Sequence, residues 1–200
     1  MTPSASTQPA QAAARPPIRL AAQLLTGLAM CLLAAPIIWF GQADPLAAFT
    51  RPMAPMWQLL IGQGLALLAA AGSYVMYRLT AQAKSTTDTI AAYARLDLRG
   101  LNPLWIALAA AVGEETLFRA ALQPLLGIWI TALVFLVTHT PVYRFRRLDR
   151  ATFVQAANVF GAGVVLGLIY QYIGWIAAVL VHLWIDIIGL VVVRAALKGR

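Results

Sequence analysis

The chain has 200 residues, of which 61% are hydrophobic and only 11% are charged, and its formal net charge is +8. Soluble domains carry about 25% charged residues, so this composition argues against an ordinary water-soluble domain and indicates a chain surrounded by lipid. The positive charge does not indicate a nucleic-acid partner, because the basic residues lie in short segments between apolar runs, as in membrane proteins. The single cysteine, Cys31, excludes a disulfide within the chain.

Long apolar runs follow a polar, proline-rich segment at residues 1–17, which is predicted to be a disordered tail. A helix of about 20 apolar residues is long enough to cross a hydrocarbon core of about 30 Å. The runs predict helices at residues 18–40, 57–77, 103–121, 128–139, 153–170 and 175–193. The expected fold class is therefore all-α, a polytopic membrane bundle of about six transmembrane helices.

The polar segments between these runs divide the chain into parts. Residues 78–102 are polar and of mixed charge, and the stretch 89–100 can form a short surface helix. We expect residues 18–98 to hold the two N-terminal transmembrane helices and a cytoplasmic linker. Residues 99–200 are expected to form a four-helix core.

The distribution of positive charge predicts the orientation in the membrane. With six spans and a cytoplasmic N-terminus, all but two of the 15 Lys and Arg residues lie in cytoplasmic segments. The exceptions are Arg51, in an outside loop, and Arg119, within a span. Because cytoplasmic loops of membrane proteins carry an excess of Lys and Arg, we expect the N-terminus in the cytoplasm.

A few ionisable residues lie within the predicted spans, where a charge costs about 2.5–3.5 kcal/mol even on a lenient insertion scale. Such residues are retained where they are paired or functional. The other acidic residues of the chain all lie in loops. Those within or at the end of a span, including both histidines of the chain, are Glu114, Glu115, Arg119, His139, His182 and Asp186.

The spacing of these residues brings them onto shared helix faces. Glu115 and Arg119 are four residues apart and can form an ion pair, and His182 and Asp186 have the same spacing. Glu114 is turned about 100° from Glu115, so it can point elsewhere. A carboxylate and an imidazole can activate water as a general base, and a second imidazole can stabilise an oxyanion. Hydrolysis by an activated water is therefore the expected chemistry.

The same residues fall into three motifs that resemble a known family. Glu114-Glu115-Thr-Leu-Phe-Arg119 matches EExxxR, Phe135-Leu-Val-Thr-His139 matches FxxxH, and His182-Leu-Trp-Ile-Asp186 matches HxxxB, where B is Asn or Asp. These motifs, in this order and on separate helices, are similar to those of the CPBP family, the CAAX proteases and bacteriocin-processing enzymes also called Abi. The resemblance covers about residues 99–193.

The resemblance implies an intramembrane glutamic endopeptidase with no cofactor and no metal. Glu114 then resembles the catalytic base that activates water, and His139 the partner that holds that water. Glu115 and Arg119 would support the site, and His182 and Asp186 resemble the oxyanion-stabilising pair. The best-known CAAX enzymes have Asn at the last position, so Asp186 would need a proton to donate, or would act by orienting His182.

The resemblance also implies a membrane-associated protein or peptide as the substrate, whether prenylated or not. An Ala- and Arg-rich chain with this topology is typical of bacteria, so we expect a multi-pass protein of the bacterial inner membrane. No feature of the sequence predicts the oligomeric state.

Two other interpretations stay open. The first is a zinc-dependent membrane peptidase, because His and carboxylate are ordinary zinc ligands, although the chain has no HExxH motif. The second is a non-catalytic membrane scaffold or immunity protein. A transporter is disfavoured, because the sequence shows no inverted repeat and no pair of broken helices.

Overall fold

The computed structural model describes residues 17–143 and 149–198. The predicted disordered tail lies outside the described residues except for Pro17, and residues 144–148, between the fourth and fifth predicted helices, also lie outside them. The described chain is helical, and its β-structure there is limited to two isolated bridges, which confirms the all-α prediction. Its elements are α1 Leu20–Gly41, α2 Ala47–Thr50, α3 Pro55–Thr80, α4 Lys84–Tyr93, α5 Asn102–Glu114, the π-helix η1 Glu115–Leu122, α6 Gln123–Tyr143, α7 Arg150–Tyr172 and α8 Trp175–Lys198.

Five of the described helical stretches are long and apolar enough to cross a membrane: α1, α3, the continuous stretch Asn102–Thr140, α7 and α8. Gly127 divides the third stretch with a φ of 74° and a ψ of 170°, a backbone conformation that glycine adopts without strain. The part after Gly127, residues 128–143, is about 24 Å long and therefore shorter than a full hydrocarbon core. The described residues therefore contain five candidate spans where about six were predicted, because the predicted helices at residues 103–121 and 128–139 belong to one helical stretch.

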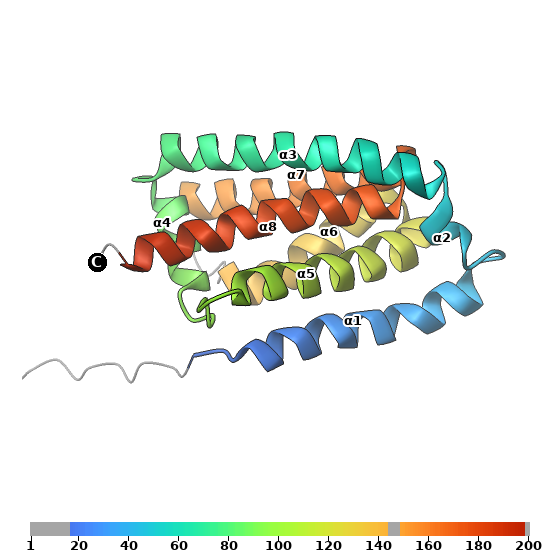
Figure 1. The fold of residues 1–200 in the computed structure, drawn as a ribbon, viewed down its shortest axis with the longest axis horizontal. Coiled ribbons are helices and arrows are strands. Elements are labelled where there is room, and N and C mark those ends of the chain that lie inside the picture. Colours follow the sequence, from blue (N-terminus) through green and yellow to red (C-terminus); the bar gives the residue numbers. More distant parts are fainter. Residues whose placement is uncertain (1–16, 144–148, 199–200) are drawn as a thin grey trace, which may run out of the picture.

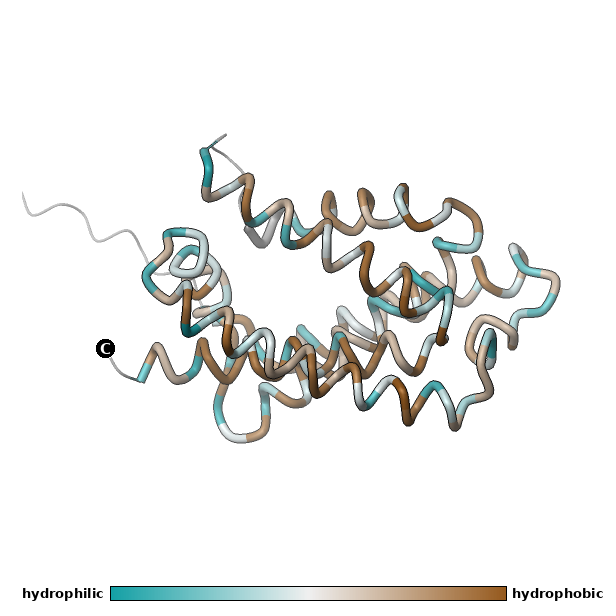
Figure 2. The backbone as a smooth tube through the Cα atoms, turned by 90° about the horizontal axis from the view of Figure 1, so that it is seen from above, coloured by the Kyte–Doolittle hydropathy of each residue, from teal (hydrophilic) through white to brown (hydrophobic). Residues whose placement is uncertain are grey.

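The helices run back and forth along one long axis (Figure 1). The start of α1, the helix α4 and the C-terminal end of α8 lie at one end of the bundle, and α2 lies at the other. Hydrophilic residues gather mainly toward the ends and hydrophobic residues along the helices (Figure 2). This distribution is expected where the middle of the bundle is solvated by lipid and its ends by water.

Small residues let the helices approach closely enough to form the core. A Cβ atom on Gly62 of α3 would lie 2.6 Å from the Cα atom of Ala177 on α8. A Cβ atom on Gly113 of α5 would lie 2.8 Å from the backbone of Gly27 on α1. Small residues at interfaces are the usual means by which membrane helices pack, because lipid gives little hydrophobic force between them.

A buried polar side chain fixes the ends of α3 and α8 that lie far from the chain termini. Gln58 of α3 is fully buried; its amide nitrogen donates to the carbonyl oxygen of Met53 at 2.8 Å. Its amide oxygen accepts from the backbone N–H of Ile176 at 3.0 Å. A buried amide needs such partners, so Gln58 holds the loop before α3 against the start of α8.

The α4 helix corrects one expectation. The sequence favoured a short surface helix at residues 89–100, whereas α4 spans Lys84–Tyr93 and ends earlier. The residues after Tyr93 instead pair by their backbone with the segment before α1, since the N–H of Ile18 donates to the carbonyl oxygen of Arg95 at 2.8 Å. This pairing competes with continued helix formation.

Candidate active site

Three separated segments supply the six ionisable residues that the sequence singles out. Glu114 is the last residue of α5, and Glu115 and Arg119 lie in η1. His139 lies on α6, and His182 and Asp186 lie on α8. The structure brings all six into one cluster in which each residue is within 4 Å of another member.

The π-helix was not predicted, because the sequence pattern favours one ordinary helix through residues 103–121. The wider i→i+5 turns of a π-helix are rare and are frequently found at functional sites. In η1 the buried side chains include Glu115, Phe118 and Arg119, so both the ion pair and an aromatic ring face the interior. The change of helix type begins at Glu115, immediately after Glu114, and separates the directions of the two carboxylates.

A chain of polar contacts runs through the most buried part of the cluster. The Nε of Arg119 donates to Oε2 of Glu115 at 3.0 Å, and both side chains are 0% exposed. The other oxygen of Glu115 lies 2.8 Å from Nδ1 of His182. Because a carboxylate oxygen accepts hydrogen bonds, Nδ1 of His182 carries the proton and donates it. Glu115 therefore connects η1 to α8 and directs Nε2 of His182 toward the rest of the cluster.

The aromatic ring of Phe135 covers this chain from α6. The guanidinium carbon of Arg119 lies 5.2 Å from the ring centroid, which is within cation–π distance. The Nη1 and Nη2 atoms of Arg119 are buried without a hydrogen-bond partner among the described residues, so the ring contact adds to the stabilisation that Glu115 gives the guanidinium. The ring centroid also lies 4.3 Å from that of His139. Phe135 therefore packs against two side chains of the cluster, Arg119 and His139.

Glu114 faces both imidazoles. Its Oε2 lies 3.8 Å from Nε2 of His139 and 3.9 Å from Nε2 of His182. On the opposite side of its ring, Nδ1 of His139 lies 2.8 Å from the carbonyl oxygen of Phe135. A carbonyl oxygen only accepts, so Nδ1 of His139 carries a proton, and in the neutral ring Nε2 presents a lone pair toward Glu114.

Exposure rises across the cluster from one side to the other. Glu115 and Arg119 are fully buried, His182, Glu114 and His139 are slightly exposed, and the side chain of Asp186 is 34% exposed. Oδ2 of Asp186 lies 3.6 Å from Nε2 of His182. The cluster is therefore approached from the side of Asp186, with its ion pair at the closed end.

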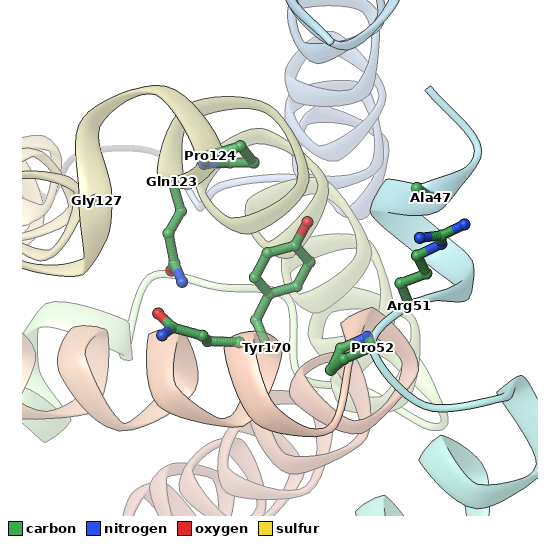
Figure 3. A pocket seen from close by; sticks show the side chains of 8 residues that line it. Ala47, Arg51, Pro52, Gln123, Pro124, Gly127 and Tyr170 are labelled. Atoms are coloured by element: carbon green, nitrogen blue, oxygen red, sulfur yellow. The ribbon is translucent and has the colours of Figure 1, made fainter. Parts of the chain in front are cut away.

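A separate cavity of about 320 Å³ lies elsewhere in the bundle (Figure 3). Gln123 and Pro124 at the start of α6 line it, with Tyr170 of α7 between them and Arg51. None of the six predicted site residues lines this cavity. This cavity is therefore separate from the cluster of ionisable side chains.

The zinc interpretation requires three or more ligands that converge on one point. Among residues 17–143 and 149–198, no group of three or more His, Cys, Asp or Glu side chains has that arrangement. The Nδ1 atoms of His139 and His182 contact Phe135 and Glu115, which turns both Nε2 atoms toward Glu114. Histidines that bind zinc through Nε2 often have such an Nδ1 contact, so the zinc interpretation is tested with a chelator below.

The fold and the cluster define a multi-pass membrane protein with a carboxylate–imidazole site inside its helical bundle. Residues 100–188 match the sequence model of a family described as Rce1-like, type II CAAX prenyl endopeptidase Rce1-like. The matched segment contains all six residues of the cluster and is similar in sequence to that family of membrane endopeptidases. No curated protein and no solved structure matches the chain.

Removing the charge of Glu115 should destabilise the bundle strongly. The substitution Glu115→Gln leaves Arg119 buried without a counter-charge, and breaking a buried pair costs about 3–5 kcal/mol. Thermal unfolding of the purified protein in one detergent measures this loss as a lower Tm. The matched control is Lys84→Gln, which breaks the exposed pair with Asp88 at 2.7 Å and should change the Tm little. Equal effects of the two substitutions would contradict the structural role of the buried pair.

Proposed function

We propose that this protein is an intramembrane endopeptidase in which Glu114 and His139 activate a water molecule to hydrolyse a peptide bond of a membrane-associated substrate. The observation that carries the proposal is the position of Glu114, whose Oε2 faces the Nε2 atoms of both histidines. The similarity of residues 100–188 to the CAAX prenyl endopeptidase family supports hydrolysis of peptides as the reaction.

The proposed activation of water follows from hydrogen-bonding roles. An ionised Glu114 and a neutral His139 that is protonated on Nδ1 both present acceptors to the space between them. A separation of 3.8 Å is too long for a direct hydrogen bond but allows one water to donate a proton to each group. Such a water keeps its oxygen lone pairs for attack, so both residues raise its nucleophilicity.

The proposed reaction conserves atoms and protons. The water oxygen forms a bond to the carbonyl carbon of the substrate while Glu114 takes a proton from the water. The C–N bond of the tetrahedral intermediate then breaks, and the same proton passes from Glu114 to the leaving nitrogen. The products are a new carboxyl terminus and a new amino terminus, and Glu114 returns to its ionised state.

His182 and Asp186 are proposed to stabilise the oxyanion of the intermediate. Glu115 accepts a hydrogen bond from the Nδ1–H of His182 and thereby favours a doubly protonated ring, whose Nε2–H can donate to the developing negative charge. Asp186 is the most exposed member of the cluster and lies beside that Nε2 atom. It either donates a proton of its own or orients His182. Arg119 acts through Glu115 and is a positioning residue.

The orientation and location extend the proposal. Basic residues at the end of the bundle that holds the start of α1 and the end of α8 support a cytoplasmic N-terminus. The composition supports the bacterial inner membrane as the location. The description of the family as a CAAX prenyl endopeptidase makes a lipid-anchored peptide the first substrate class to test.

Glu114→Gln should abolish cleavage. The amide keeps the size of the side chain but cannot take a proton from water, and loss of a general base lowers rates by about 10²–10⁴-fold. The measurement is cleavage of a panel of membrane-anchored peptides, with and without prenyl groups, by purified protein with and without a chelator. Tm values of the variant and the wild type control for folding.

The outcomes separate the alternatives. Cleavage that is lost in Glu114→Gln and insensitive to chelator supports the glutamic mechanism. Cleavage that the chelator removes contradicts it in favour of a metallopeptidase. A wild-type protein that cleaves no peptide, together with a Glu114→Gln variant that has no phenotype in cells, contradicts catalysis and favours a scaffold.

Asp186→Asn should retain cleavage within about tenfold of the wild type, because an Asn amide can donate to an oxyanion without needing a proton of its own. Asp186→Leu removes every hydrogen-bond donor that residue 186 could supply and should lower kcat by about 10²–10³-fold. The matched pair is compared by kcat and KM on the best substrate of the panel. Equal losses in both variants would show that the carboxyl group itself is required.

A further inference from the structure

A second cavity has a volume of about 730 Å³, and the residues just before α1 and the end of α8 contribute to its lining. These two segments lie at the same end of the bundle (Figure 1). The charged lining of the cavity comes from three segments that are far apart in sequence. Arg19 precedes α1, Asp97 and Arg99 lie between α4 and α5, and Arg194 and Lys198 lie in the last turns of α8. Most of the other lining residues are apolar.

Backbone contacts hold these segments together around the cavity. The N–H of Ile18 donates to the carbonyl oxygen of Arg95, and the N–H of Asp97 donates to the carbonyl oxygen of Ile18 at 3.2 Å. From α8, Nη1 of Arg194 donates to the carbonyl oxygen of Gly100 at 2.9 Å. Hydrogen bonds therefore connect the three segments that line the cavity, so the cavity is not a gap between independent loops.

The cavity carries an excess of positive charge. Asp97 neutralises Arg99 through two hydrogen bonds of 2.8 Å, and this guanidinium lowers the pKa of Asp97 to about 2, so the pair stays ionised. Within the described part of the chain no ion pair neutralises Arg19, Arg194 or Lys198. Three cations therefore remain around a cavity with one acidic residue.

The position of the cavity indicates which chemical groups lie near its cations. Because α8 is long and apolar enough to span the membrane, its last turns lie at a membrane–water boundary. Phospholipid phosphates lie at this depth, and basic pockets at the ends of membrane helices bind anionic headgroups. The apolar part of the lining suits the acyl chains below a headgroup.

We propose that this cavity binds a phosphate group, supplied by the headgroup of an anionic phospholipid. The proposal does not depend on the peptidase function, because none of the residues involved belongs to the carboxylate–imidazole cluster.

The test uses the purified full-length protein in a neutral detergent. Thermal unfolding is followed with added phosphatidylglycerol, with phosphatidylcholine, or with inorganic phosphate. Ligand that binds the folded state raises the Tm, and we expect phosphatidylglycerol to raise it by roughly 4 °C or more. The double variant Arg19→Gln/Lys198→Gln should lose most of this shift. Both side chains are exposed, so the variant should fold.

The matched control is Arg78→Gln/Arg150→Gln, which removes the same charge from exposed positions at the end of α3 and the start of α7, outside the cavity. This control should keep the full shift. Equal losses in the two double variants, or an equal shift with phosphatidylcholine, would overturn the proposal. A shift of the same size with inorganic phosphate, lost in the same variant, would support the phosphate site and assign it to a free anion.

Discussion

The pairing of Arg119 with Glu115 is the constraint on which the rest of the site depends. Both side chains are fully buried in a lipid-facing bundle, and an unpaired charge there would be strongly destabilising. The second oxygen of Glu115 accepts from His182, so the pair also joins η1 to α8. The contact between Glu115 and His182 sets the direction of the imidazole and therefore the geometry around Glu114. In the proposed mechanism neither Glu115 nor Arg119 contacts the substrate.

The architecture supports this arrangement through close packing and one irregular helix. Glycines at the contacts of α3 with α8 and of α5 with α1 let the backbones approach, while Gln58 fixes the far ends of α3 and α8. The π-helix turns Glu115, Phe118 and Arg119 inward directly after Glu114. Gly127 then changes the direction of the chain, so that the part of α6 after it packs against η1 and supplies Phe135 and His139.

Much of this organisation could be predicted from the sequence, because both hydrophobic runs and four-residue spacings are local signals. The helices and the cluster of six ionisable residues were found in this way. The π-helix, the ring of Phe135 over Arg119 and the second histidine contact of Glu114 depend on tertiary packing and leave no periodic signal. The sequence did not predict the basic cavity for the same reason. Arg19, Arg99 and Arg194 line one cavity only because the backbone pairs near Ile18 and because α8 ends beside that segment.

The central claim is that water, held by Glu114 and His139, attacks the peptide bond directly. The most direct measurement is a single turnover in H₂¹⁸O with enzyme in excess over a cleaved peptide, followed by mass spectrometry of the product and of the peptide containing Glu114. The account predicts one ¹⁸O atom in the new carboxyl terminus of the product and none in Glu114. Label in Glu114, or a first product without label, would contradict it by showing that the carboxylate itself attacks the substrate.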